Sequence, residues 1–121
     1  MFADSYISEG TTPRKYSSAN LTAIILTKNE RENLAACIAS VQGFARRVVV
    51  VDSGSTDGTA ALAESLGAAV YTHPFTYYAA QFNWGVDNAD IDTDWILRLD
   101  ADERFTPALC AEAVSVMKWV V

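Results

Sequence analysis

Uninterrupted apolar runs predict four buried strands along this chain. They lie at residues 21–27, 48–51, 69–72 and 95–99, the last interrupted once by Arg98. Continuous runs of Val, Ile and Leu are typical of strands that are covered on both faces, as in a parallel sheet. Polar residues follow three of these runs directly. The pattern therefore predicts strands that present polar groups at their carboxyl ends.

Apolar residues at helical spacing fill the first gap between these runs. Asn29 is predicted as the helix N-cap, Glu32 completes a variant of the capping box three residues on, and Gly43 ends the helix. The predicted buried face of this helix consists of Leu34, Cys37, Ile38 and Val41.

Three further helices are predicted after the later strands. They lie between a cap at Thr56 or Asp57 and Gly67, from about residue 79 to 88, and over 109–121. The last follows Thr106 as a cap and Pro107 at the first helical position. Strand and helix alternate throughout, which predicts an α/β domain with a mainly parallel sheet flanked by helices.

This domain is predicted to span residues 21–121, with residues 1–20 as a flexible leader. The leader is rich in Ser, Thr and Tyr and shows neither helical nor strand periodicity. In parallel α/β sheets, ligands bind beyond the carboxyl ends of the strands. We therefore expect the polar groups at 27–30, 52–57 and 100–103 to share one rim, and a role in binding is favoured over solvated turns.

Composition excludes several classes of partner. The chain has 121 residues and a net charge of −6, which argues against nucleic-acid binding because phosphate backbones attract Lys and Arg. An anionic ligand would instead need a bridging cation. Cys37 and Cys110 lack metal-binding spacing and are predicted to be buried free thiols of a reducing compartment. No apolar run is long enough for a signal peptide or a membrane span, so a cytoplasmic location is predicted, with peripheral membrane contact left open.

Asp100 and Asp102 are the candidate metal ligands. They lie two residues apart at the end of a strand, so their side chains can converge on one ion, and carboxylate oxygens suit Mg²⁺ or Mn²⁺. The alternative is an acidic turn that caps the next helix. For Asp57 a helix-capping role is favoured over a ligand role, and His73 is expected to be structural, in a loop or partly buried.

Three other ligand-binding folds fit the sequence less well. The turn after the first strand, at 26–30, contains no glycine, whereas a dinucleotide-binding fold requires a glycine-rich turn there. No Walker-type phosphate loop occurs. A phospho-acceptor receiver domain would have acids after its first strand, where this chain has Lys28 and Asn29.

Four motifs together resemble one enzyme family. They are Leu-Thr-Lys-Asn-Glu at 26–30, Val-Val-Asp-Ser-Gly-Ser-Thr-Asp-Gly-Thr at 50–59, Ala-Ala-Gln-Phe-Asn at 79–83 and Trp-Ile-Leu-Arg-Leu-Asp-Ala-Asp-Glu at 95–103. In this order and spacing they resemble the nucleotide-binding half of family 2 glycosyltransferases, which have the Rossmann-like GT-A fold. More narrowly, they are similar to the bacterial branch that adds sugars to the lipopolysaccharide core. The resemblance runs from about Leu21 to the last residue.

The resemblance implies an inverting transfer of a sugar from a nucleotide diphosphate, with a UDP-sugar favoured, to a lipid-linked or saccharide acceptor. Such a reaction would serve lipopolysaccharide or cell-surface polysaccharide synthesis at the inner face of the membrane. Asp52 would hold the nucleoside, and Asp102, assisted by Asp100, would hold the Mg²⁺ or Mn²⁺ ion. The substrate contacts implied by the motifs are Thr27, Asn29, Glu30, Asp52, Ser53, Gln81, Asn83 and Asp100.

The chain departs from the family pattern in two respects. Phe82 stands where many relatives have a basic residue, so Lys28 or Arg98 would have to supply a cationic contact to the donor. The family's second half, with the acceptor site and the general base, would follow Val121, and we therefore expect this chain alone to be inactive. The uncovered flank predicts a homo-oligomer, in which the last helix lies near the contact through Val116, Met117, Trp119 and Val120.

Three alternatives to this function stay open. The chain can be a non-catalytic module that binds nucleotide or metal, a nucleotidyltransferase of similar fold, or a structural domain completed by a second copy. The lack of a glycine-rich basic loop after the first strand counts against the nucleotidyltransferase.

Overall fold

Strands and helices alternate along the whole described part of the chain. The computed structural model describes residues 19–120, with side chains for residues 20–113. The elements are β1 (Ala19–Thr27), α1 (Arg31–Gln42), β2 (Ala45–Asp52), α2 (Thr59–Ser65), β3 (Ala69–Thr72), α3 (Tyr78–Asn88), β4 (Trp95–Asp100) and α4 (Pro107–Val120). Most of the predicted leader lies outside the described residues, and its last two residues already belong to β1. None of the helices within residues 19–120 has the length and apolar content to cross a bilayer.

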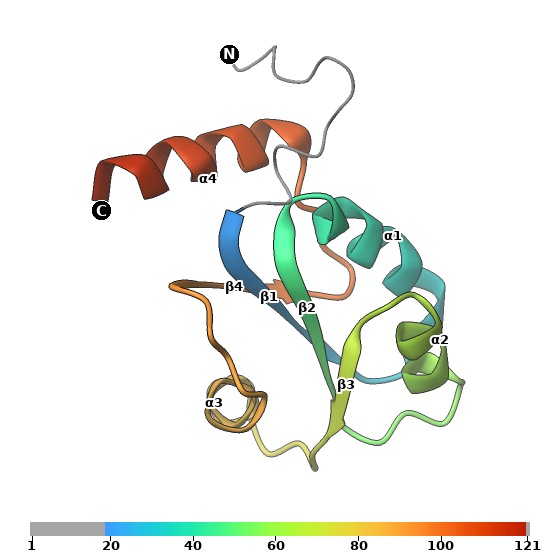
Figure 1. The fold of residues 1–121 in the computed structure, drawn as a ribbon. Coiled ribbons are helices and arrows are strands. Elements are labelled where there is room, and N and C mark those ends of the chain that lie inside the picture. The colour runs from blue at the N-terminus through green and yellow to red at the C-terminus, as the bar shows by residue number, and fades with distance from the viewer. Residues whose placement is uncertain (1–18, 121) are drawn as a thin grey trace.

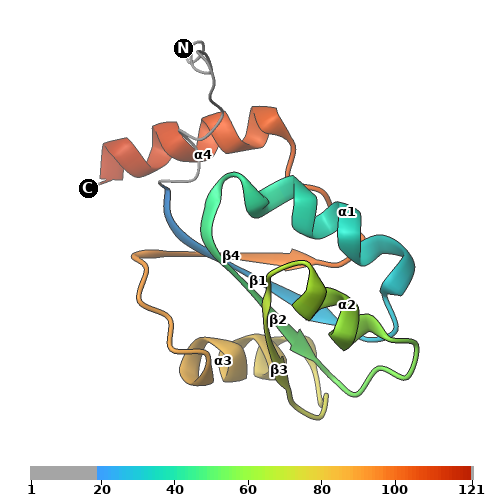
Figure 2. The same ribbon diagram turned by 45° about the vertical axis from the view of Figure 1, so that its right-hand side comes forward.

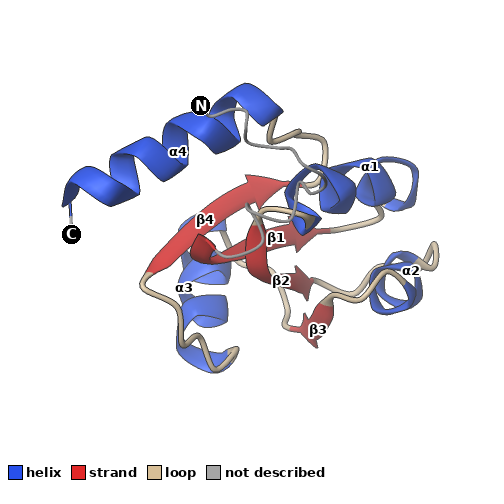
Figure 3. Ribbon diagram, turned by 45° about the horizontal axis from the view of Figure 1, so that its top comes forward, coloured by secondary structure: helices blue, strands red, loops and turns tan. Residues whose placement is uncertain are grey.

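The four strands form one parallel sheet in the order β3-β2-β1-β4, which confirms the predicted α/β class. Figure 3 shows this order from one edge of the sheet to the other. Thr27 on β1 lies beside Asp52 on β2, and Leu26 lies beside Asp100 on β4. Because Thr27, Asp52 and Asp100 are the last residues of their strands, the polar groups at these strand ends meet at one edge of the sheet.

Helices cover both faces of the sheet, and this explains why the central strands are apolar throughout. α1 and α2 lie on one face and α3 on the other (Figures 1 and 2). Ala23 and Ile25 of β1 face α1, whereas Ile24 and Leu26 face α3, and all four are buried. Side chains alternate along a strand, so a strand covered on both faces needs apolar residues at every position.

Helix α3 packs closely on the sheet because Gly85 has no side chain. A Cβ atom at Gly85 would lie 3.0 Å from Cγ2 of Val51 on β2. The helix packs on β1 and β2. On β4, the side chains of Ile96 and Arg98 are exposed.

Two of the predicted helix starts are wrong. The N-cap of α1 is Glu30, which makes no side-chain capping bond, so the capping box predicted from Asn29 and Glu32 is not formed. Asn29 has a left-handed backbone, with φ 53°. The N-cap of α2 is Gly58, with φ 90°, one residue beyond the predicted Asp57. The start of α4 is confirmed, because the Leu109 amide donates to Thr106 Oγ1 at 3.2 Å.

Both cysteines are buried free thiols, as predicted. Burial raises the pKa of Cys37 to about 11, and burial likewise raises the pKa of Cys110 to about 11. Neither is therefore poised as a nucleophile, because the thiolate is the reactive form.

Candidate functional site

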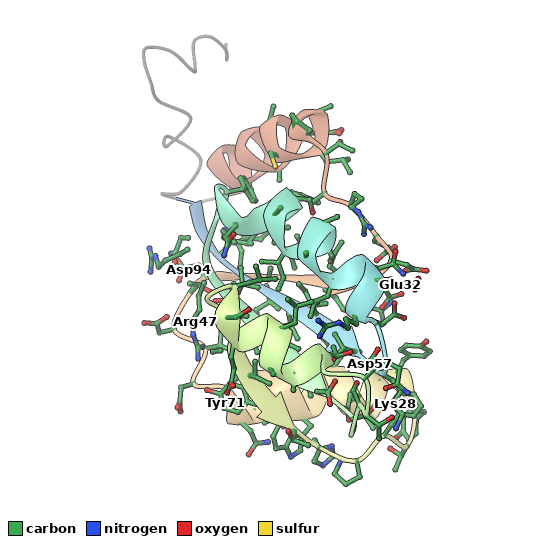
Figure 4. All side chains as sticks on the ribbon, turned by 90° about the vertical axis from the view of Figure 1, so that its right-hand side faces the viewer. Lys28, Glu32, Arg47, Asp57, Tyr71 and Asp94 are labelled. Atoms are coloured by element: carbon green, nitrogen blue, oxygen red, sulfur yellow. The ribbon has the colours of Figure 1, made fainter. Side chains whose placement is uncertain are left out.

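Hydrogen bonds join the loop after β1 to the loop after β2 into one unit. Each of the five residues 27–31 bonds to the segment 52–59. The contacts are Thr27 Oγ1 to Asp52 Oδ1 (2.6 Å), Lys28 Nζ to the Gly54 carbonyl (3.1 Å), the Asn29 amide to Ser55 Oγ (2.7 Å), the Glu30 amide to Thr59 Oγ1 (3.0 Å) and the Arg31 amide to Asp57 Oδ2 (3.2 Å). Figure 4 shows Lys28 and Asp57 at this end of the molecule, with Arg47 and Asp94 at the opposite end.

Asp52 is the centre of this unit rather than an open ligand. Its side chain is 2% exposed. Oδ1 accepts from Thr27 Oγ1 and Ser55 Oγ, each at 2.6 Å, and Oδ2 accepts from the amides of Gly54 (3.0 Å) and Ser55 (2.8 Å). These bonds occupy the acceptor capacity of a carboxylate. Asp52 therefore has no free acceptor position in this structure, and its predicted contact with a nucleoside stays a prediction.

The hydrogen bonds to Asp52 also keep it ionised. Burial by itself would raise the pKa of this carboxyl, but the bonds from Ser55, Thr27 and Gly54 together outweigh burial and hold the pKa below its ordinary value. An ionised carboxylate accepts stronger hydrogen bonds than a neutral one. Asp52 thus remains the acceptor that holds both loops.

Asp57 bonds to the starts of two helices, so its role is structural as predicted, although Gly58 and not Asp57 is the N-cap of α2. Its Oδ1 accepts from the Thr59 amide (3.0 Å) and from the Thr59 hydroxyl, and its Oδ2 accepts from the Arg31 amide. Arg31 and Thr59 are the first residues of α1 and α2. The hydrogen bond from the Thr59 side chain is the main cause of the lowered pKa of Asp57, and the amides of Arg31 and Thr59 add to it.

A cavity of about 600 Å³ opens beside this unit, at the carboxyl ends of β1, β2 and β4. Its walls come from these strand ends and from the start of α3. The lining residues are Leu26, Thr27, Lys28, Glu30, Ser53, Pro74, Phe75, Tyr78, Gln81, Asp100, Ala101 and Asp102. A space of this size accommodates a small-molecule ligand.

Three of the predicted contact residues do not line this cavity. Asn29 is tied to the loop after β2, because its Oδ1 accepts from the Thr56 amide (2.8 Å). Asp52 is buried, and the next residue, Ser53, lines the cavity in its place. Asn83 is exposed on α3, because Gln81 and Gly85 take the face of that helix that is buried against the sheet. The structure thus brings together Thr27, Glu30, Ser53, Gln81, Asp100 and Asp102.

The two acids after β4 leave an oxygen without a partner. Asp102 is exposed, while Oδ1 of Asp100 is buried and accepts no hydrogen bond. Burial raises the pKa of Asp100, the nearby Glu103 adds to this, and Arg98 opposes it. A buried carboxylate oxygen with no partner is unfavourable unless a cation or donor meets it. The residues therefore fit a divalent cation at this point.

The protein alone offers few ligands for such an ion. Within the described residues, no group of three or more His, Cys, Asp and Glu side chains is arranged to hold a metal. Mg²⁺ takes six oxygen ligands and usually keeps water or substrate phosphate among them. A cation held by Asp100 and Asp102 would share its remaining positions with a ligand in the cavity.

Gln81 lines the cavity, and two hydrogen bonds to His73 fix its side chain. The Gln81 side chain is 1% exposed; its Nε2 donates to the His73 carbonyl and its Oε1 pairs with His73 Nδ1, both at 3.0 Å. The His73 ring stacks on Trp84 with centroids 4.4 Å apart. His73 is therefore structural, as predicted, and Gln81 shapes the cavity wall instead of presenting a free amide.

Sequence reasoning missed an aromatic wall of the cavity. Phe75 and Tyr78 line it, are 47% and 58% exposed, and have ring centroids 5.4 Å apart. Exposed aromatic groups at a cavity are typical of ligand contacts. The density of aromatic residues at 75–78 was visible in the sequence, but nothing there placed them opposite the acids.

The parallel sheet and the acids at its strand ends fit the GT-A fold of glycosyltransferases. A family model described as Glycosyl transferase family 2 matches residues 22–119, and the chain belongs to that family.

Relatives and solved structures agree with this assignment. An uncharacterized glycosyltransferase of Rickettsia felis is 43% identical over 89 residues, which cover 74% of this chain and 31% of that protein. The lipopolysaccharide core biosynthesis glycosyltransferase LpsC of Rhizobium meliloti is 40% identical over 94 residues, covering 74% of this chain and 34% of that protein. The chain thus spans about a third of the length of these relatives.

The fold is also that of glucosyl-3-phosphoglycerate synthase from Mycobacterium tuberculosis. Its crystal structure in complex with Mn²⁺, uridine-diphosphate and glucosyl-3-phosphoglycerate matches with a TM-score of 0.58 and 22% identity. The match covers 78% of this chain and 39% of that chain.

Proposed function

We propose that the cavity binds a nucleoside diphosphate sugar, with a UDP-sugar favoured, as the donor of an inverting glycosyl transfer. The carrying observation is the buried, unpartnered Oδ1 of Asp100 beside the exposed Asp102 on the cavity wall. The synthase of similar fold, crystallised with Mn²⁺ and uridine-diphosphate, supports this proposal.

In this proposal, Asp102 and Asp100 hold Mg²⁺ or Mn²⁺, with Asp102 as the more direct ligand. When bound, the ion would stabilise the negative charge that develops on the leaving diphosphate. Thr27 and Ser53 would contact the nucleoside, since both line the cavity on the side of the joined loops. Asp52 would act indirectly, by fixing the Thr27 hydroxyl and the amides of Gly54 and Ser55 next to Ser53.

Calorimetric titration with UDP, GDP and ADP in the presence of Mn²⁺ tests the proposal. We expect UDP to bind most tightly and its affinity to fall when the metal is chelated. An Asp102→Asn variant should lose the metal-dependent part of the affinity, whereas Asp92→Asn, an exposed acid before β4, should not. Absent or equal binding of all three nucleotides would contradict the proposal.

The proposal extends to the biosynthetic pathway and to the place in the cell where the protein acts. LpsC is named a lipopolysaccharide core biosynthesis glycosyltransferase. We therefore propose that the protein takes a lipid-linked or saccharide acceptor in lipopolysaccharide or cell-surface polysaccharide synthesis, at the cytoplasmic face of the membrane. A relative of full length that carries this domain should transfer radiolabelled sugar from a UDP-sugar to a lipopolysaccharide core acceptor and not to a lipid-free unrelated glycan. This chain, which spans about a third of that length, should bind the donor without transferring the sugar.

Self-association is also proposed. Ile96 on β4 and Leu109 on α4 are 36% and 44% exposed and line an apolar groove of about 360 Å³. The side chains predicted to lie near the contact, at residues 116–120, are not among those that the structure describes, which are the side chains of residues 20–113. Light scattering should show a dimer or larger assembly that a Leu109→Glu substitution weakens, and a monomer at every concentration would refute it.

A further inference from the structure

Arg98 lies on the same face of the sheet as the cavity acid Asp100. Arg98 is beside Ile24 and Asp100 is beside Leu26 in the parallel pairing of β4 with β1. Ile24 and Leu26 both belong to the core beneath α3. Since neighbouring residues in register share a face, Arg98 and Asp100 point to the α3 side, one pleat apart.

Tyr78 brings the Arg98 guanidinium towards the cavity. The guanidinium carbon of Arg98 lies 6.0 Å from the centroid of the Tyr78 ring. Tyr78 is the first residue of α3 and lines the cavity. Arg98 does not itself line the cavity, but this contact keeps its long, exposed side chain beside a residue of the cavity wall, because a cation is attracted to the face of an aromatic ring.

Two other cations near the acids already donate to backbone carbonyls. Lys28 Nζ donates to the Gly54 carbonyl at 3.1 Å, and Arg104 Nη1 donates to the carbonyls of Ala101 and Glu103 at 3.1 and 2.8 Å. Arg98 makes no hydrogen bond to any residue that the structure describes; it lies over the Tyr78 ring and interacts electrostatically with Asp100. Its five N–H donors are therefore available to a ligand.

The net negative charge of the cavity wall favours a further cationic side chain near the diphosphate. Three carboxylates, Glu30, Asp100 and Asp102, line the cavity beside one lysine. A diphosphate adds further negative charge, and one divalent cation offsets only part of the sum. Phe82, on α3, supplies no charge.

We infer that Arg98, held against the Tyr78 ring, donates hydrogen bonds to the phosphate oxygens of the donor. The inference rests on the proposed function and names the cation that completes its diphosphate site. The planar guanidinium fork matches two phosphate oxygens at once, which a lysine ammonium cannot reproduce. Arg98 therefore distinguishes donors by their phosphates and not by their base.

The test compares UDP with uridine, each titrated in the presence of Mn²⁺. Arg98→Ala should weaken UDP binding by about 10- to 100-fold, the range expected for hydrogen bonds to a charged group, and leave uridine binding unchanged. Arg98→Lys should weaken UDP binding less than Arg98→Ala does, because one charge remains. Tyr78→Leu should also weaken UDP binding by a smaller factor than Arg98→Ala. Arg46→Ala, which removes an exposed arginine at the opposite end of the sheet, is the matched control.

The possible outcomes separate a failure of the Arg98 contact from a failure of the proposed binding of a UDP-sugar. Unchanged UDP affinity in Arg98→Ala would overturn the inference and leave the proposed function standing. An equal loss for UDP and uridine would also overturn it, because Arg98 would then act on the nucleoside or on the fold. If Arg98→Ala does not fold, Arg98→Lys decides, and parental UDP affinity in that variant overturns the bidentate contact. If the parent chain binds no UDP, the proposed function fails and the inference fails with it.

Discussion

At the scale of single residues, Asp52 is an acid at a strand end whose hydrogen bonds hold two loops together. Its position after a buried strand predicted a place on the rim, which the pairing with Thr27 confirms. Its partners could not be predicted, because they come from segments 25 residues apart and depend on the register between β1 and β2. Sequence spacing identifies the acid, but only the register shows that its oxygens are occupied.

Removing the Asp52 carboxylate should destabilise the domain. Asp52→Ala leaves the amides of Gly54 and Ser55 without acceptors. Roughly 1–3 kcal/mol for each of these two unpaired donors gives an expected loss of about 2–6 kcal/mol in the free energy of unfolding. Urea denaturation measures this loss. Asp87→Ala, on the exposed face of α3, is the control and should change stability by less than about 0.5 kcal/mol. A loss in Asp52→Ala no larger than in this control would refute the role.

The same residue makes stability depend on pH. The folded chain holds the pKa of Asp52 below the ordinary value of 3.8, so the unfolded state binds a proton more readily. The contribution of Asp52 is complete above that value and is lost as the pH falls towards the folded-state pKa. The unfolding free energy of Asp52→Asn should therefore fall less steeply below about pH 4 than that of the parent. Parallel profiles would contradict this.

At the scale of elements, sequence periodicity predicted strands better than helix starts. β3 has the predicted bounds, and β4 differs by one residue. The start of α1 was missed because the Asn29 side chain accepts from the Thr56 amide, in the loop after β2, and not from its own helix. The start of α2 was missed by one residue, because Asp57 accepts from Thr59 of its own helix and also from Arg31 at the start of α1. Local capping patterns assume local partners, and here the partners are supplied by the tertiary structure.

The close contact of α3 with the sheet gives an element-scale prediction. Gly85→Leu places a side chain where even a Cβ atom would lie 3.0 Å from Val51, so we expect a loss of about 1–3 kcal/mol from overpacking, measured by thermal or urea denaturation. Gly43→Leu is the matched control, because nothing lies within 4 Å of a Cβ atom at Gly43. Equal stability of the two variants would show that α3 can move away from the sheet without cost.

At the scale of the whole molecule, the site arises from the sheet order. β1 lies between β2 and β4, and this brings Ser53 and the acids Asp100 and Asp102, far apart in the sequence, to one cavity. The alternation of strands and helices was enough to predict this rim. It could not predict the wall of Phe75 and Tyr78, because that depends on how the segment between β3 and α3 folds back over the strand ends.

We propose that a nucleotide and a metal ion bind together at the carboxyl ends of the strands. Locating both of them on the molecule tests this most directly. In ¹⁵N–¹H spectra of the chain with UDP, substoichiometric Mn²⁺ broadens the amide signals nearest to it. We predict that the signals of Ala101, Asp102 and Ser53 disappear first, and that those of Arg47 and Asp92, at the other end of the sheet, stay sharp. Broadening that is uniform, or that is strongest at Arg47 and Asp92, would contradict a nucleotide and metal site at the carboxyl ends of the strands.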